Sequence, residues 1–418
     1  MLLLKRTVSF FLILSTVLSF TGCSFDKQKE DRNDNTVEDV PEYITTYCDY
    51  PEIEGFTPID RKDYYAYNKL SNIQKEIYNS LVKLSEEFSL EPMYFEGSKK
   101  NDITIAYNAF TDDFPQFFWV GNAYEYSEKG GWCGISFDAK NGFVCVDNIE
   151  ERDEINRQIN QKIKEIITST VTPEMSDYEK ELRLHDYICE NMTYNRDAAD
   201  KADEDRTSEE LRNWSILGAL FDNTGVCESY SKIFQLLLYN IGIPCTQLSG
   251  HTDDRHMWNA VKIEDEWCYV DVTWDDLEAR GLEYNHSCFN MSEQILGYEH
   301  KKYTSNFYEV SQKEFQIGEF NFFDEKVGSK YYYYKMEDLV VDNNSFESIV
   351  IPALKKVWDG SSASREFCVL GNEISVERVN SMIGDLDIYG MFRGAKAIKY
   401  IRLPSGNAFV LHVTKKKD

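Results

Sequence analysis

The sequence predicts an α+β protein in which helices lead into an antiparallel sheet. Apolar residues recur at helical spacing in four stretches, near 73–88, 155–166, 176–188 and 227–241. Residues 256–276 instead alternate with period two on either side of Glu264-Asp265, which indicates an antiparallel hairpin. Helices followed by such a hairpin are typical of the α+β class. The length of 418 residues also allows two or three domains.

The N-terminus has the features of an export signal. A basic pair at 5–6 precedes an apolar stretch over 8–20. Thr21-Gly22 then stands directly before Cys23, and this end of the signal resembles the lipobox of bacterial lipoproteins, whose cysteine is lipidated. The resemblance implies that Cys23 anchors the mature chain to the bacterial cell membrane, on its extracytoplasmic side. The alternative is a signal that is cut elsewhere or kept as a membrane anchor.

We therefore expect residues 1–22 to be a lipoprotein signal peptide and 23–55 to be a flexible tether. Residues 24–50 are mostly charged or polar, so they cannot bury enough apolar surface to form a core. Such a tether would hold the folded part away from the membrane.

The net charge excludes one class of partner. The formal charge is −27, and loss of Lys5 and Arg6 with the signal would make it −29, because residues 1–22 contain no acidic residue. A surface of this sign repels phosphate backbones, so we expect no binding of nucleic acid. Neutral or basic polypeptides remain suitable as partners.

The cysteines give no indication of a metal site. After Cys23, nine cysteines remain, and an odd number leaves at least one thiol unpaired unless two chains pair. The sequence has no C-x-x-C, and no spacing of cysteine and histidine suits a structural zinc ion. We expect neither a metal nor another cofactor.

Residues 56–149 are expected to form an N-terminal α+β region. An amphipathic helix follows Ser71 and ends before Pro92 and Gly97. The aromatic-rich stretch after it contains Asn141-Gly142 between two short apolar runs, which predicts a hairpin at that pair.

Residues 150–305 are expected to form the core that carries the chemistry. A helix over 155–166 is followed by a second helix, which begins with the capping box Ser176-x-x-Glu179. The charged stretch 196–210 could be a cation-binding loop, but it has no glycine for the tight turn that calcium ligands need. We interpret it as a solvated excursion.

Residues 306–418 are expected to form a smaller α+β accessory domain. The sequence predicts a helix over 346–357, a strand over 365–372 and a helix near 376–383. Ser405-Gly406-Asn407 lies between alternating runs and predicts another hairpin.

Cys227 is the first candidate for catalysis. It lies in the first turn of the predicted helix 227–241, which ends at Gly242 and Pro244. Residues 223–225 could cap this helix, and its free N–H groups would then stabilise a thiolate or an oxyanion on a substrate. The alternatives are a buried packing residue or half of a disulfide.

The hairpin supplies two further candidates. If Glu264-Asp265 is a two-residue turn, His256 and Asp271 share one face of the sheet as diagonal neighbours, within hydrogen-bonding reach. A three-residue loop would turn Asp271 to the opposite face. A carboxylate behind an imidazole fixes its orientation, and an imidazolium beside a thiol favours the thiolate. In isolation, however, His256 could be a packed strand histidine and Asp271 could cap a turn.

These motifs resemble a known family. GVCESYSKIF, HMWNAVKI and WCYVDVTWDD occur in the order seen in the transglutaminase-like superfamily of papain-like thiol enzymes. The resemblance extends to LHDYICENMTYN before the cysteine and NHSCFNMS after the aspartate, so it covers about 150–300. It implies a transglutaminase-like or papain-like core, and DDFPQFFWV is similar to the stretch that precedes this core in bacterial lipoproteins of the group.

The resemblance also implies roles for single residues. Cys227 is expected to be the nucleophile, His256 the general base and acid, and Asp271 the orienting carboxylate. Two positions depart from the family pattern: Ser229 replaces a usual glycine, and Glu264-Asp265 replaces Asp-Gly. Ser229 could therefore narrow the acyl site. The tryptophans that crowd the hairpin could exclude water, and Trp258, Trp274 and Ser229 are the candidates for substrate binding.

The leading hypothesis is a membrane-tethered thiol acyl-transfer enzyme that acts on peptide or glutamine amides, as a peptidase or amidase rather than a cross-linking enzyme. Nothing in the sequence marks a dedicated lysine-binding site. One alternative is a protein-glutamine transglutaminase that cross-links surface proteins. Another is a non-catalytic lipoprotein that binds peptides or cell-wall material, and a third is recruitment to a partner by the C-terminal domain. The sequence gives no indication of oligomeric state.

Overall fold

A computed structural model describes most of the chain between residues 50 and 296 and parts of the remainder. The described residues are 50–121, 123–201, 207–251, 255–276, 284–293, 295–296, 323–334, 339–340, 345–352, 364–370, 381, 395–402 and 408–415. The expected signal peptide, Cys23 and nearly all of the expected tether lie outside them. Within the described part of the chain, no helix is both long and apolar enough to cross a membrane.

The N-terminal region combines helices with a small sheet. A short 3₁₀ turn η1 (Arg61–Asp63) and α1 (Tyr65–Asn68) lead into α2 (Asn72–Glu86) and α3 (Lys100–Asp113). A capping box at Ser71 starts α2, as the amphipathic pattern predicts. Strands β1 (Met93–Glu96), β2 (Tyr124–Lys129) and β3 (Trp132–Phe137) form an antiparallel sheet in the order β1-β3-β2.

The hairpin of this region is not at Asn141-Gly142, so that prediction is wrong. The turn between β2 and β3 is made by Gly130 and Gly131, whose φ angles of 62° and 86° suit a glycine pair. Asn141 belongs instead to a turn in which its backbone N–H donates to the Asp138 side chain over 2.6 Å. An aspartate that accepts from the backbone two or three residues on forms such a turn without a hairpin.

Two long helices begin the core. Helix α4 (Ile149–Thr170) starts at Asn148, whose side chain accepts from the N–H of Glu151. Helix α5 (Asp177–Asn191) has the capping box expected at Ser176 and Glu179. Arg152 on α4 is fully buried, and its guanidinium donates to the carbonyl of Glu86 at the end of α2 over 2.6 Å. The bond to Glu86 joins α4 to the N-terminal region. Asp153, the next residue of α4, pairs with the buried charge of Arg152.

Short elements connect α5 to the central helix. They are β4 (Thr193–Tyr194), α6 (Arg196–Asp200), α7 (Ser208–Leu211), η2 (Arg212–Trp214), η3 (Gly218–Asp222) and β5 (Thr224–Gly225). The charged stretch that we interpreted as a solvated excursion therefore carries one turn of helix on each side of residues 202–206. Strands β4 and β5 pair in parallel, with Tyr194 opposite Gly225.

The central helix packs against an antiparallel sheet. Helix α8 (Cys227–Asn240) packs on β6 (Cys245–His251) and β7 (Arg255–Ile263). With β8 (Glu266–Val270) these strands form a sheet in the order β6-β7-β8. Gly242 follows α8 with a φ of 82°, as expected for the end of a helix. Residues 223–225 do not cap α8, because its N-cap is Val226 and no side chain bonds there.

The two-residue turn at Glu264-Asp265 is confirmed. Ile263 pairs with Glu266 and Asn259 with Val270, which is the register that brings His256 and Asp271 to one face. Glu264 takes a φ of 54°, a left-handed conformation that glycine or asparagine adopts more readily.

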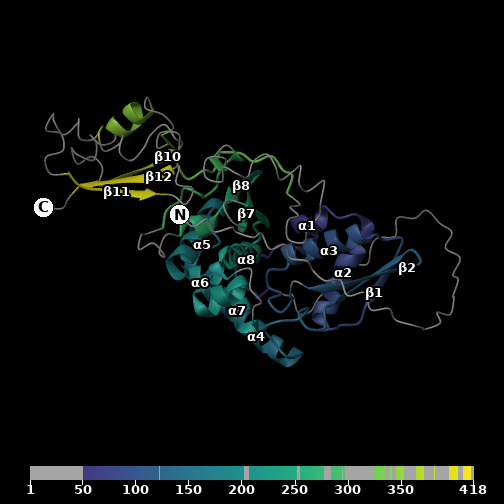
Figure 1. Ribbon diagram of the computed structural model, residues 1–418. Helices are drawn as coiled ribbons and strands as arrows, with labels where there is room; N and C mark the ends of the chain where they lie inside the picture. The colour runs from purple at the N-terminus through teal and green to yellow at the C-terminus, as the bar shows by residue number, and fades with distance from the viewer. Residues whose placement is uncertain are drawn as a thin grey trace, which may run out of the picture.

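One continuous apolar core joins these parts. A single cluster of buried residues extends from Ile53 to Phe323 and includes α2, α3, α8 and the central sheet. At the junction, Tyr64 stacks on Tyr239 of α8, and the side-chain amides of Gln235 and Gln247 both donate to the carbonyl of Asp112. Figure 1 shows α8, β7 and β8 in the middle of the molecule, with α2, α3, β1 and β2 on one side.

A four-stranded sheet lies on the other side of the core (Figure 1). It contains β9 (Leu339–Val340), β10 (Ser364–Leu370), β11 (Ala395–Arg402) and β12 (Ala408–Lys415) in the order β11-β12-β10-β9. The predicted strand near 365–372 and the pairing of β11 with β12 are confirmed, and one helical segment, η5 (Phe346–Val350), precedes β10. The turn at 405–407 and nearly all of the predicted helix near 376–383 lie outside the described residues.

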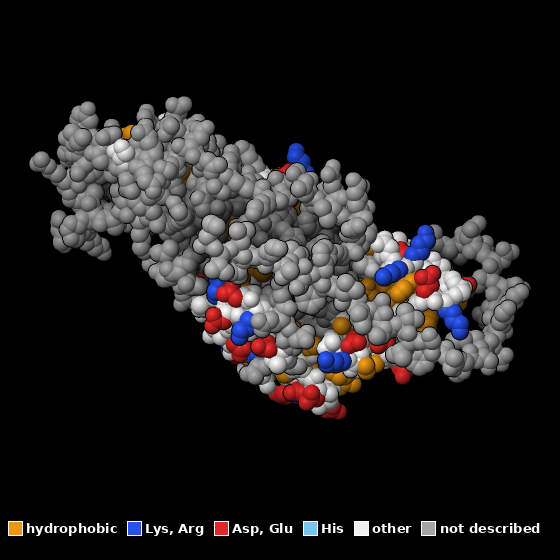
Figure 2. Space-filling view, viewed as in Figure 1, with side chains coloured by type: hydrophobic (Ala, Val, Ile, Leu, Met, Phe, Trp, Pro, Cys, Tyr) orange, Lys and Arg blue, Asp and Glu red, His pale blue; other side chains and the backbone are white. Residues whose placement is uncertain are grey.

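The surface carries mixed charge. Figure 2 shows Asp and Glu side chains interspersed with Lys and Arg over the described part of this face, with acidic groups at the exposed end of α4. Residues 150–154 of that helix contribute four acidic side chains near its N-terminus, where the helix dipole favours negative charge.

Candidate active site

Cys227 is the first residue of α8. The N–H of Val226 donates to the carbonyl of Asn213 over 2.9 Å, which fixes the chain just before the cysteine. In the first helical turn the N–H of Ser229 donates to the carbonyl of Val226, whereas the N–H groups of Cys227 and Glu228 have no partner within the helix and lie at the positive end of its dipole. The side chain of Cys227 is half-buried and not in a disulfide. A sulfur at this position is accessible and faces a donor-rich end of the helix.

The His256 imidazole lies beside this sulfur and is held by Asp271. The Nε2 atom of His256 is 2.6 Å from Oδ2 of Asp271, and the Cys227 thiol is a second hydrogen-bond partner of the ring. Because Nε2 faces the carboxylate, the thiol contact falls to Nδ1. The structure therefore brings Cys227, His256 and Asp271 together in the order thiol, imidazole, carboxylate.

Asp271 makes two structural hydrogen bonds besides the one to the imidazole, one through its carboxylate and one through its backbone N–H. Asp271 is the N-cap of α9 (Val272–Asp275), and its Oδ1 accepts from the N–H of Trp274 over 3.1 Å. Its own N–H donates to the carbonyl of Cys288. These bonds orient both carboxylate oxygens, so that one is directed to the helix and the other to His256.

His256 is held in its protonated form. Burial alone would lower the pKa of the imidazole, but the charge of Asp271, its hydrogen bond and the contact with Cys227 together raise the pKa of His256 to about 10. A neutral imidazole can take the proton of a thiol beside it, and the imidazolium that results stabilises the thiolate by charge attraction.

Two tryptophans flank the imidazole. Its ring centroid is 5.8 Å from that of Trp258 and 5.1 Å from that of Trp274, with interplanar angles of 27° and 30°. Trp258 is buried, whereas Trp274 is half-buried. Of these two substrate-binding candidates, Trp274 is therefore the one with a surface that a substrate could touch. Trp267 lies elsewhere, against Tyr65 and Phe323.

Comparison with known proteins finds a family that matches the region containing these residues. Residues 164–272 match the model of the transglutaminase-like superfamily, and this segment contains all three residues of the arrangement. These residues form a transglutaminase-like domain. Its fold is the mixed α+β transglutaminase-like or papain-like fold that the sequence motifs imply.

The transglutaminase-like domain is similar to one curated protein and to two solved structures. The chain is 24% identical over 125 residues to the kyphoscoliosis peptidase of Mus musculus, which covers 27% of this chain and 18% of that protein. One solved structure, described as a TGase, covers 44% of this chain and 52% of its own, at 16% identity and a TM-score of 0.25. A putative cysteine protease from Cytophaga hutchinsonii covers 28% and 37%, at 17% identity and a TM-score of 0.22. The chain thus spans less than a fifth of the peptidase that it resembles.

Ser229 does not face the sulfur as a free hydroxyl. It is fully buried, and its Oγ donates to the carbonyl of Ser215 over 2.7 Å. Its side chain also lies against Gly225, where an added Cβ would come within 2.5 Å of Ser229. In this transglutaminase-like domain, the serine therefore packs the helix against the preceding loop, and its hydroxyl is already bonded.

Tyr194 is a site residue that the sequence reasoning did not single out. The pairing of β4 with β5 places it opposite Gly225, two residues before the nucleophile candidate. Burial and the nearby charges of Cys227 and Asp271 raise the pKa of Tyr194, so its hydroxyl keeps its proton. The only signal in the sequence was its place in the MTYN stretch, which the family resemblance already included.

Further contacts keep the helix and the strand in place. The Ser231 hydroxyl donates to the carbonyl of Trp258, and the Asn259 side chain donates to the carbonyl of Ser231, both over 3.1 Å. Tyr230 donates through its hydroxyl to Asp276 just after α9. All of these groups are buried, so the transglutaminase-like domain holds α8, β7 and α9 as one unit.

Proposed function

We propose that this protein is an exported, membrane-tethered thiol acyl-transfer enzyme that acts on peptide or glutamine amides, as a peptidase or amidase. The observation that carries the proposal is the single line of contacts from Cys227 through His256 to Asp271. Thiol acyl transfer needs a nucleophile, a base in contact with it and a group that orients the base. Support also comes from the transglutaminase-like family match and from the peptidase among the relatives.

In the proposed reaction, the Cys227 sulfur attacks the amide carbonyl and forms a tetrahedral oxyanion. Donors for this oxyanion are the N–H groups at the start of α8 and the protonated hydroxyl of Tyr194. The imidazolium of His256 then protonates the leaving amine, and a thioester remains on the sulfur. Water, activated by the now neutral imidazole, attacks the thioester and releases the acid.

The proposed export and membrane tethering are supported by the sequence alone. The basic, apolar and small residues before Cys23 support a lipoprotein signal, with residues 23–55 as the tether. The strongly negative charge supports peptide or protein substrates and disfavours nucleic acid. Residues 306–418 would act as an accessory domain that could direct the enzyme to a partner.

Hydrolysis and cross-linking differ only in the molecule that attacks the thioester. To separate them, the chain is incubated with a pool of glutamine-containing peptides and a labelled primary amine, and the products are read by mass spectrometry. We expect cleaved or deamidated peptides with little amine incorporation. Dominant amine incorporation would make the protein a transglutaminase. If the unaltered protein gives neither cleaved or deamidated peptides nor amine-labelled peptides, the alternative of a non-catalytic binding protein is favoured.

Replacement of Tyr194 by phenylalanine tests the oxyanion assignment. The ring and its packing against Tyr230 are kept, whereas the hydroxyl donor is lost. We expect kcat to fall by about 10²-fold or more with little change in KM, because a donor to the oxyanion acts mainly in the transition state. Tyr187→Phe is a matched control, since its half-exposed phenol lies on the preceding helix. An unchanged kcat for Tyr194→Phe would remove Tyr194 from the mechanism.

A further inference from the structure

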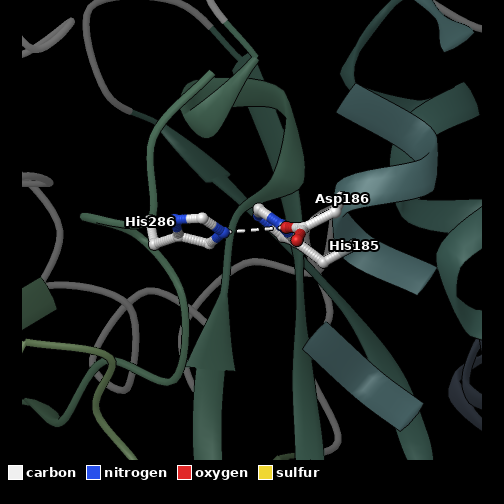
Figure 3. Close-up of side chains that lie close together, drawn as sticks. All are labelled: His185, Asp186 and His286. Carbon is white, nitrogen blue, oxygen red and sulfur yellow. Dashed lines mark hydrogen bonds and ion pairs between the residues drawn. The ribbon is translucent and has the colours of Figure 1, made fainter. Parts of the chain in front are cut away.

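A second cluster of chemically active side chains lies outside the proposed triad. His185 and Asp186 are neighbours on α5, and His286 comes from the segment 284–290 that follows the catalytic hairpin. Figure 3 shows a ring nitrogen of His286 directed toward the Asp186 carboxylate, with the His185 ring close beside that carboxylate. Residues about a hundred positions apart therefore meet at one carboxylate.

The atoms of this cluster are close enough to share one ion. Oδ1 of Asp186 is 3.1 Å from Nδ1 of His185 and 2.7 Å from Nε2 of His286. One ligand atom from each of the three residues lies within 4.8 Å of the others. Zn–N and Zn–O distances of about 2.0–2.1 Å in a tetrahedral site separate neighbouring ligand atoms by about 3.3 Å. To receive an ion, Oδ1 of Asp186 and Nε2 of His286 would separate by about 0.6 Å, and the two imidazole nitrogens, which lie within 4.8 Å of each other, would settle at about 3.3 Å.

Asp275 holds the His185 ring in an orientation that suits a metal ligand. Its other nitrogen, Nε2, is 3.1 Å from Oδ2 of Asp275, which is fully buried. Oδ1 of Asp275 accepts in turn from the N–H of Cys288 over 2.9 Å. Histidines that bind metals usually donate their second N–H to a carboxylate or a carbonyl, which fixes the ring and makes the ligating nitrogen more basic. With Nε2–H directed to Asp275, the lone pair of neutral His185 is on Nδ1.

The environment suits a partly accessible ion. His185 is fully buried, whereas the side chains of Asp186 and His286 are 19% and 12% exposed. The ring of Tyr333 stacks on His286 at a centroid distance of 4.0 Å, and Phe289 lies edge-on to His185. The protein thus encloses three ligands and leaves the Asp186 and His286 side open to one water molecule.

We propose that His185, Asp186 and His286 bind a divalent transition metal ion of the zinc type, with water as the fourth ligand. Two imidazoles and one carboxylate suit zinc and its neighbours, whereas calcium and magnesium prefer oxygen ligands and copper(I) prefers sulfur. Without the metal, His185 can donate from both nitrogens to Asp186 and Asp275. Binding of the ion releases the Nδ1 proton of His185 and all but one of the ion's water ligands to solvent. The Nε2 proton of His286, which faces Asp186, moves through solvent to Nδ1 of the same ring, and no electron is transferred.

The consequence of binding is structural. The ion would join α5 to the segment 284–290, and the Asp275 bond would extend this link to α9, whose N-cap is Asp271. The site does not depend on the proposed acyl-transfer chemistry, because none of its three ligands contacts Cys227 or His256 in the described part of the chain. The spacing of cysteine and histidine gave no hint of it, since the two histidines are 101 positions apart in the chain.

The test is zinc binding by the untagged full chain. The affinity for Zn²⁺ is measured by competition with a chromophoric chelator. The amount of zinc bound per chain is measured by elemental mass spectrometry. We expect one zinc per chain, at least about tenfold weaker binding in His286→Gln, and unchanged binding in His412→Gln, which removes a histidine from β12 instead. Co²⁺ should give the visible absorption of a tetrahedral ion in the wild type and not in His286→Gln.

Two further variants keep the test decisive. Asp186→Asn removes a ligand charge at a partly exposed position, so it should weaken zinc binding even if His286→Gln folds poorly, and circular dichroism reports the folding of each variant. Cys227→Ser should bind zinc as tightly as the wild type. No zinc binding by the wild type, undiminished binding in both ligand variants, or loss of binding in Cys227→Ser would each overturn the proposal.

Discussion

Replacement of Cys227 by alanine is expected to abolish turnover of peptide substrates, by about 10⁴-fold or more in kcat. Loss of the nucleophile removes the covalent route entirely, and what remains is the contribution of binding and of the oxyanion donors. The same variant should lose labelling by a thiol-directed probe at residue 227. Both effects are read by product formation and by mass spectrometry of the probe adduct.

The control for this result is Cys145→Ser. Cys145 and Cys227 are the cysteines that are not fully buried among those the structure describes. Burial raises the pKa of the Cys145 thiol to about 11, so it should react slowly with an electrophile at neutral pH. Equal labelling of the two cysteines at pH 7, or full turnover by Cys227→Ala, would contradict the nucleophile assignment.

The register of the hairpin formed by β7 and β8 could be predicted because a shift by one residue would turn every side chain to the wrong face. His256 and Asp271 were expected on one face only with a two-residue turn, and the pairing of Ile263 with Glu266 confirms that turn. What the sequence could not show is why Glu264 adopts a positive φ there. Its carboxylate bonds to Lys330 and Tyr331, which lie more than sixty residues further along the chain. Tertiary contacts thus compensate for the missing Asp-Gly.

Local turn chemistry explains the failure at Asn141-Gly142. That pair and Gly130-Gly131 both offer a residue that tolerates positive φ, so sequence alone does not decide which of them joins two strands. The outcome depends on Asp138, whose side chain accepts from the N–H groups of Lys140 and Asn141 and closes a different turn. The prediction that residues 223–225 cap α8 was wrong for a related reason: Asn223 adopts a left-handed φ of 52°, and the helix begins only after Val226.

Contacts between distant segments were beyond the sequence argument. Tyr194 comes near the sulfur through a parallel pair of two-residue strands, which no periodicity reveals. His185, His286 and Asp275 meet because α5 and the segment after the hairpin pack on the same side of α9. Motif spacing detects residues that one element or one hairpin brings together, but it does not detect those that only the packed fold brings together.

Replacement of Asp271 by asparagine should lower kcat by about 10³- to 10⁴-fold while the fold persists. Asparagine keeps an Oδ1 that accepts from the N–H of Trp274, so the cap of α9 is retained. The negative charge behind His256 is lost, although burial of the ring is unchanged. The pKa of the imidazole should therefore fall, and less of it is available as the acid that protonates the leaving amine. Asp271→Ala, which loses the cap as well, should show the same loss of kcat and a lower melting temperature.

The pH dependence of stability and of kcat/KM tests whether the pKa of His256 falls in Asp271→Asn. In the wild type, the pKa of His256 is raised from 6.5 to about 10, so the stability gained from the imidazolium is complete below pH 6.5 and is lost as the pH rises toward 10. In Asp271→Asn this alkaline loss of stability should be smaller and should end at lower pH, and the alkaline limb of kcat/KM should also move to lower pH. Thermal unfolding at pH 6 and pH 10, together with the pH profile of kcat/KM, measures both. An alkaline limb at the same pH in both proteins would mean that the carboxylate does not control the protonation of His256, and the assignment of Asp271 as the orienting group would then be wrong.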